Sequence, residues 1–152
     1  MAEFNTYLNF PGNTEEAFNF YRSVFGGEFQ AVMRFGEMPG CDEAPIGEAD
    51  KDKIMHIALP VGKGNMLMGT DSLESMGQKL SFGNNSYICV TPDSRDDADR
   101  LFSGLTDGGK VETPMADMPW GGYFGSGTDR FGVQWMIHID NNNGGNGNGG
   151  GN

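Results

Sequence analysis

The sequence contains two similar segments that lie 81 residues apart, and this internal repeat constrains the fold more than any other feature. Each segment has a strand-like run, a proline-containing turn and an amphipathic helix that ends near a glycine, Gly27 or Gly108. The apolar positions of the two predicted helices share the spacing i, i+3, i+4 and i+7. They are Ala17, Phe20, Tyr21 and Val24 in the first helix and Ala98, Leu101, Phe102 and Leu105 in the second. Two copies of one unit predict a pseudo-symmetric fold with a cleft between its halves.

The predicted elements follow the order βαβββ in both halves. In the first half they are a strand at 4–10, a helix that begins after Asn13, and strands at 29–35, 54–60 and 65–70. In the second half they are a strand at 86–91, a helix at 94–105, and strands at 110–115, 123–126 and 133–139. Asn13 is expected to cap the first helix, with Glu16 as its capping-box partner. The predicted class is α+β.

Length and composition predict one domain over residues 1–140, with half-modules at about 1–72 and 81–140 and a polar linker between them. Residues 141–152 contain only Asn and Gly and are expected to form a flexible appendage. The acidic segment 36–52 predicts a solvated loop, with a role as a dimer interface or as a lid over the cleft.

The net charge of −11 argues against nucleic-acid binding, because such a surface repels phosphate. No apolar run approaches the roughly 18 residues that a membrane helix needs, so no membrane association is expected. No signal peptide is visible, and the two cysteines, Cys41 and Cys89, form neither a disulfide framework nor a zinc site. We therefore expect a cytoplasmic protein.

Several short motifs occur in an order that resembles the vicinal-oxygen-chelate superfamily, and within it the PhnB-like branch. They are YLNFPGN at 7–13, VFGG at 24–27, MLMGTD at 66–71, WGGYFG at 120–125 and DRFGV at 129–133. The superfamily includes glyoxalase I, extradiol dioxygenases and bleomycin- and fosfomycin-resistance proteins. The resemblance implies two βαβββ modules that form a curved-sheet cleft, completed within one chain or across a homodimer.

The resemblance also implies where a metal site would lie, because metal-dependent members place four ligands on their first, fourth, fifth and eighth strands. The corresponding positions are Thr6, Gly69, Tyr87 and Met136, and none offers a carboxylate, an imidazole or a thiolate. A register shift of one residue in either direction does not supply such a ligand set. We therefore expect neither a metal nor another cofactor.

The predicted cleft is instead lined by apolar, aromatic and a few polar side chains. The candidate ligand-binding residues are Thr6, Leu67, Gly69, Tyr87, Trp120, Gln134, Met136 and His138, with Leu8 as a further lining residue. Such a lining suits a planar or apolar small organic molecule. The alternative, that these side chains simply fill the interior, stays open.

Two functions follow. The first is a metal-free small-molecule-binding protein that acts as a homodimer. The second is an isomerase or lyase of the same superfamily that uses His56, His138 or the loop carboxylates, with a divalent metal or without any cofactor. Relatives of this branch sometimes carry the label of a demethylubiquinone methyltransferase. We reject that activity here, because the sequence shows no glycine-rich loop after its first strand and no parallel αβ alternation.

Overall fold

The computed structural model describes residues 2–37 and 46–140, and the chain divides into two compact units, Met1–Ser81 and Phe82–Asn152. Each unit is described by itself. The predicted flexible tail at 141–152 lies outside the described residues, and so does Cys41 of the acidic loop. The prediction of a single domain over residues 1–140 stays a prediction.

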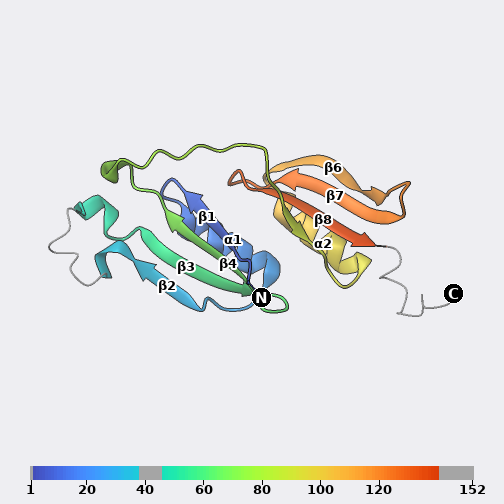
Figure 1. Ribbon diagram of the computed structural model, residues 1–152, viewed down its shortest axis with the longest axis horizontal. Helices are drawn as coiled ribbons and strands as arrows, with labels where there is room; N and C mark the ends of the chain where they lie inside the picture. The colour runs from blue at the N-terminus through green and yellow to red at the C-terminus, as the bar shows by residue number, and fades with distance from the viewer. Residues whose placement is uncertain (1, 38–45, 141–152) are drawn as a thin grey trace. The chain divides into compact units, whose positions relative to one another are not determined.

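The first unit is a four-stranded mixed sheet with one helix (Figure 1). Its elements are β1 (Thr6–Phe10), α1 (Thr14–Phe25), β2 (Ala31–Arg34), β3 (Ile54–Val61) and β4 (Asn65–Asp71), with short 3-10 turns at Phe35–Glu37, Glu48–Asp50 and Glu74–Met76. The strand order is β1-β4-β3-β2; β1 runs parallel to β4, and the other pairs are antiparallel. The β3–β4 hairpin turns through Gly62 and Gly64, both with positive φ, as the sequence predicts.

The second unit repeats this topology. Its elements are β5 (Ile88–Val90), α2 (Arg95–Thr106), β6 (Lys110–Asp117), β7 (Gly122–Thr128) and β8 (Gln134–Asp140). The strand order is β5-β8-β7-β6, and β5 runs parallel to β8. The predicted α+β class and the βαβββ repeat are therefore confirmed.

The two helices occupy equivalent places in their units. Each has 12 residues, with Ala17 or Ala98 at its fourth position and Tyr21 or Phe102 at its eighth, and all four side chains are buried. The buried face of α1 also includes Phe18, which is fully buried and lies outside the i, i+3, i+4, i+7 pattern, while Phe20 of that pattern is only half-buried. Neither helix is long and apolar enough to cross a membrane, and no other helix in the described ranges is.

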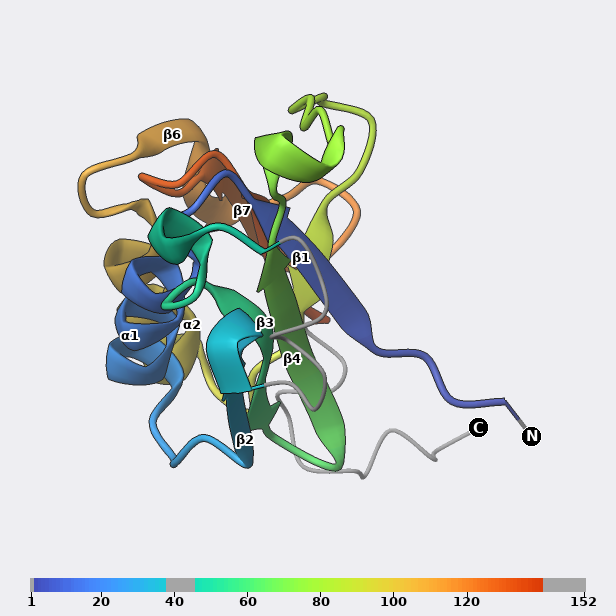
Figure 2. The same cartoon turned by 90° about the vertical axis from the view of Figure 1, so that its left-hand side faces the viewer.

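The start of α1 differs from the predicted capping box. The Asn13 side chain caps nothing, and its Oδ1 atom is buried without a hydrogen-bond partner in the described chain. Instead, Oδ1 of Asp71 accepts hydrogen bonds from the backbone N–H and the hydroxyl of Thr14, at 2.9 and 2.6 Å. Oδ2 of Asp71 accepts a third bond from the backbone N–H of Ile54 at 2.8 Å. One buried carboxylate thus ties the helix to both central strands, and α1 packs against one face of this sheet (Figure 2).

The strands repeat with a different offset from the helices. In β1 the side chains that face the core include Leu8, which is paired with the buried Gly69. In β5 they include Ile88, which is paired with the buried Trp135. Ile88 follows Leu8 by 80 residues, whereas Ala98 follows Ala17 by 81, so the second unit has one extra residue between strand and helix. Because side chains alternate between the faces of a strand, positions that are 81 residues apart lie on opposite faces of the two first strands. Thr6 thus faces the helix of its unit, whereas Tyr87 lies on the opposite face from Ile88.

Candidate functional site

Each sheet has one face covered by the helix of its unit. In the first unit α1 packs over Leu67 and Gly69, and in the second α2 packs over Trp135 and Ile137. We call the face turned away from the helix the open face of each unit. Strand register places Tyr7, Asn9, His56, Ala58, Met66 and Met68 on the N-terminal open face, and Cys89, Phe124, Thr128, Gln134, Met136 and His138 on the C-terminal open face.

Three of the predicted ligand-binding residues lie on the helix-covered face of the first unit. Leu67 is 3% exposed, and it pairs directly with Thr6. A Cβ atom added at Gly69 would lie 2.6 Å from Cε1 of Phe18, so this glycine makes room for a core ring. The predicted positions in β1 and β4 are therefore one residue away from the open face, because strand alternation places Tyr7 and Met68 there. Leu8, the further lining residue, shares this covered face.

The N-terminal open face instead presents Tyr7 and His56. The Tyr7 hydroxyl lies 3.4 Å from Nδ1 of His56, and the two rings stack with their centroids 5.9 Å apart at an interplanar angle of 26°. Tyr7 is 47% exposed, so the pair can be reached from outside the unit. Met33 pairs across the sheet with His56, and Met68 pairs with Ala58. This face therefore combines one positioned imidazole with an apolar, methionine-containing surface.

The C-terminal open face brings together four of the predicted residues. Gln134, Met136 and His138 alternate along β8, and Tyr87 directly precedes β5. The Nε2 amide of Gln134 donates a 2.6 Å hydrogen bond to the Ser86 carbonyl, which joins the start of β8 to the segment before β5. These residues supply the mixture of apolar and polar groups that a small-molecule site needs.

A carboxylate that sequence reasoning missed lies beside Tyr87. The Tyr87 hydroxyl donates a 2.5 Å hydrogen bond to Oε2 of Glu112, and the Thr128 hydroxyl donates a 2.8 Å bond to Oε1. These bonds hold the pKa of Glu112 below its usual range, while the bond to the carboxylate raises the pKa of Tyr87. No spacing rule connects these three residues, because they come from β6, β7 and the segment before β5.

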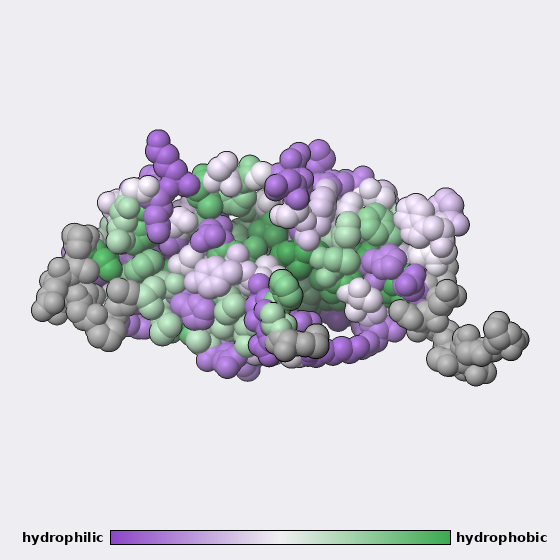
Figure 3. Space-filling model, viewed as in Figure 1, coloured by the Kyte–Doolittle hydropathy of each residue, from purple (hydrophilic) through white to green (hydrophobic). Residues whose placement is uncertain are grey.

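Trp120 lies in the turn between β6 and β7, as the sequence predicts. The backbone N–H of Met118 donates to the Gly122 carbonyl at 2.7 Å, and the N–H of Gly121 donates to the Met118 carbonyl at 2.9 Å. The indole is 69% exposed. Hydrophobic side chains reach the visible surface among hydrophilic ones, as Figure 3 shows. Trp120 is thus available for contact.

The described residues contain no group of three His, Cys, Asp or Glu side chains arranged to hold a metal ion. Two carboxylates of the acidic loop, Glu48 and Asp50, have protein partners. Glu48 pairs with Lys51 at 2.9 Å, and Asp50 pairs with Lys53 at 2.8 Å and accepts a 2.7 Å hydrogen bond from Ser75. These contacts indicate that Glu48 and Asp50 stabilise the conformation of the loop.

Two successive βαβββ units, each with its first strand parallel to its last and its helix on one face, define a class of tandem α+β proteins. The sequence profile of the Glyoxalase/Bleomycin resistance protein/Dioxygenase superfamily matches residues 4–137, and the chain belongs to this superfamily.

Individual relatives support the PhnB-like resemblance. Protein YjdN of Escherichia coli (strain K12) is 30% identical over 139 residues, which cover 88% of this chain and 92% of that protein. The crystal structure of protein PA1353 from Pseudomonas aeruginosa has a TM-score of 0.78 at 36% identity, and covers 92% of this chain and 98% of that one. A PhnB protein from Bacillus cereus, titled a putative 3-demethylubiquinone-9 3-methyltransferase, has a TM-score of 0.71 at 26% identity, with 91% and 99% covered. The predicted PhnB-like resemblance is confirmed.

Proposed function

We propose that this protein is a metal-free small-molecule-binding protein that holds a small organic molecule against the open face of a sheet. The observation that carries the proposal is the gathering of Tyr87, Gln134, Met136 and His138 at the C-terminal open face. Met136 offers a soft apolar surface, Tyr87 an aromatic one, and the Gln134 amide and the His138 ring offer polar anchors. Trp120 is proposed as a further contact because of its exposure.

On the N-terminal open face, Tyr7, His56 and Met68 take the places that we first assigned to Thr6, Leu67 and Gly69. The replacement follows from strand alternation, since Tyr7 and Met68 are direct partners in the β1–β4 ladder. We propose that these side chains form a separate contact surface of the first unit for a small organic molecule, with the stacked Tyr7–His56 pair as its polar part.

We also propose a cytoplasmic homodimer. In the described residues each sheet is open, with β1 and β2 at the edges of one and β5 and β6 at the edges of the other. Edge strands carry unpaired backbone groups that association can cover. Light scattering at micromolar concentration should give twice the 16.4 kDa mass of the chain, and a monomer would contradict the dimer.

The second candidate function is an isomerase or lyase that uses His56 or His138 with a divalent metal. The observation that favours it is the Tyr7–His56 pair, because an oriented imidazole is a common general acid or base. The two hypotheses differ in their response to metal. A metal that binds the folded state raises its melting temperature by mass action, so a shift with nickel or zinc that His56→Ala abolishes would favour the enzyme. We do not propose methyl transfer, because each sheet here contains only one parallel pair, within the described strands, in place of a parallel αβ alternation.

The binding proposal can be tested by native mass spectrometry of the purified protein and by titration with a neutral planar probe, naphthylmethanol. Met136→Arg places a charge in the middle of the C-terminal open face and should abolish binding. Met76→Arg makes the same substitution at a methionine that is 53% exposed in the segment after β4, and it should have no effect. Equal binding by the two variants would contradict the assignment of the site.

A further inference from the structure

We propose that Glu112 is the anchor for an organic ammonium group, so that the ligand of the C-terminal open face is a planar amine that carries a positive charge. This inference rests on the proposed function, and it adds the chemical class of the ligand. Its basis is the arrangement of Glu112, Tyr87 and Thr128, together with the charges around them.

The carboxylate is held in place from two sides. Tyr87 donates to one oxygen at 2.5 Å and Thr128 donates to the other at 2.8 Å. Glu112 itself lies where the β6–β7 register shifts, between Val111 and Thr113. Irregularities of this kind redirect a side chain and are frequent beside functional sites. Since each carboxylate oxygen can accept more than one hydrogen bond, both retain capacity for a donor from a ligand.

The carboxylate also keeps its negative charge without an ion pair. Two other acids of this unit pair with an arginine: Asp117 with Arg95 at 2.9 Å, and Asp107 with Arg130 at 3.2 Å. The hydrogen-bond partners of Glu112 are two neutral hydroxyls. The charge of Lys110, two residues along β6, helps to lower the pKa of Glu112, but in the described chain no ion pair within 4.0 Å joins them. An ionised carboxylate with oriented oxygens and no ion-pair partner is a receptor for a cation that donates hydrogen bonds.

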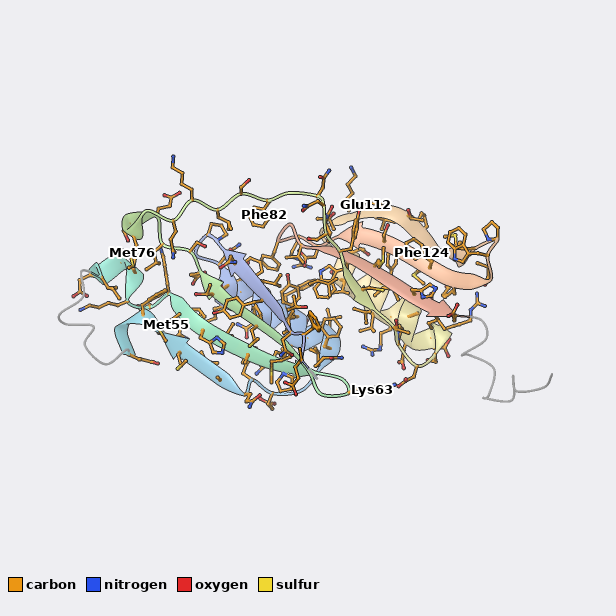
Figure 4. All side chains as sticks on the ribbon, in the orientation of Figure 1. Met55, Lys63, Met76, Phe82, Glu112 and Phe124 are labelled. Atoms are coloured by element: carbon orange, nitrogen blue, oxygen red, sulfur yellow. The ribbon has the colours of Figure 1, made fainter. Side chains whose placement is uncertain are left out.

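The neighbouring side chains determine what should be attached to that cation. Tyr87 is 38% exposed, and its ring lies beside the carboxylate that it bonds. Further along the same open face, Phe124 of β7 pairs with Ala116 of β6 and with His138 of β8, and Figure 4 labels Phe124 and Glu112. Aromatic faces attract cations and also pack against flat apolar groups. An ammonium group joined to a planar ring therefore matches both parts of the site.

The test compares three ligands that share one ring and differ in charge: naphthylmethylamine, naphthylmethanol and naphthylacetate. Calorimetric titration at neutral pH should give a preference of about tenfold or more for the amine over the alcohol, and the weakest binding for the acetate. Glu112→Gln should reduce the preference for the amine over the alcohol to near onefold, chiefly by weakening the affinity for the amine. Glu112 is exposed and Gln has nearly the same shape, so the fold should survive, and circular dichroism would check this.

The control must separate this site from the general attraction of cations by a chain of net charge −11. Glu16→Gln, at an exposed acid of α1, changes the net charge by the same amount and should keep the full preference. Equal affinity of the wild-type protein for amine and alcohol would overturn the inference, and so would an unchanged preference in Glu112→Gln. Failure of all three ligands to bind, with no co-purified molecule, would instead contradict the proposed function.

Discussion

Replacing Gly69 with alanine tests the assignment of this residue to the core. The added Cβ atom would lie 2.6 Å from Cε1 and 3.0 Å from Cζ of Phe18, and 3.2 Å from the Leu8 carbonyl oxygen. Phe18 cannot easily move away, since it is fully buried and meets Phe10 and Tyr21 edge-on, with ring centroids 6.3 and 5.5 Å apart. The substitution must therefore displace α1 or distort the β1–β4 ladder.

Overpacking of a well-packed core costs about 1–3 kcal/mol. For a chain of this length, each kcal/mol lowers the melting temperature by roughly 2–4 °C. Thermal and urea unfolding would measure the loss. A matched control is Gly47→Ala, because a Cβ at Gly47 meets no atom of the described residues within 4 Å and its backbone is extended, so stability should be unchanged or slightly higher.

A second substitution identifies the clash. Phe18→Leu removes the ring that the new methyl group meets, so the Gly69→Ala cost should fall in that background by a coupling of about 0.5–3 kcal/mol. If Gly69→Ala instead left stability equal to that of Gly47→Ala and altered only ligand affinity, Gly69 would line the ligand site and our placement of β4 would be refuted.

Three further outcomes follow from the contacts. Asp71→Asn keeps the size of the side chain but turns one acceptor into a donor, so a buried hydrogen bond is lost and chemical denaturation should show a cost of about 1–3 kcal/mol. Tyr21→Ala truncates a fully buried aromatic ring and should cost about 3–5 kcal/mol by the same measurement. Because the bond to Glu112 raises the pKa of Tyr87, its phenol should ionise above the pH of an ordinary tyrosine, and Glu112→Gln should lower that pKa in an ultraviolet titration. Any stability from this bond is present at neutral pH and is lost as the pH rises through the raised pKa.

Much of the fold could be predicted because two signals depend only on nearby residues: the hydrophobic periodicity of a helix and the preference of glycine for turns. The 3.6-residue pattern identified both helices, and Gly62 and Gly64 identified the β3–β4 turn. The cap of α1 could not be predicted, since its acceptor, Asp71, lies 57 residues away in the sequence from Thr14. A local rule selects the nearest suitable residue, and here the nearest one was Asn13.

The faces of the strands were harder to predict, and this explains the errors in the first unit. Alternation is informative when one face is polar, but the open face of β4 carries Met66 and Met68, which are as apolar as the core residue Leu67. Without a polar face the position in the first strand depended on a count of residues back from Tyr21 in the helix, and an error of one residue in such a count moves a side chain to the other face. In the second unit the buried Trp135, Ile137 and Ile139 alternate with Met136 and His138, so these two side chains lie on the open face, and their role in binding stays a proposal.

The pairing of β1 with β4, and of β5 with β8, also has a consequence for the origin and engineering of the chain. Every strand of a sheet comes from one contiguous half of the sequence, so each half supplies the complete backbone ladder of its own sheet. A single ancestral gene segment that encoded one βαβββ unit could thus be copied in tandem without a new strand partner. By the same reasoning, a cut near Ser81 separates no pair of strands, and the two fragments should be suitable for co-expression as a split protein.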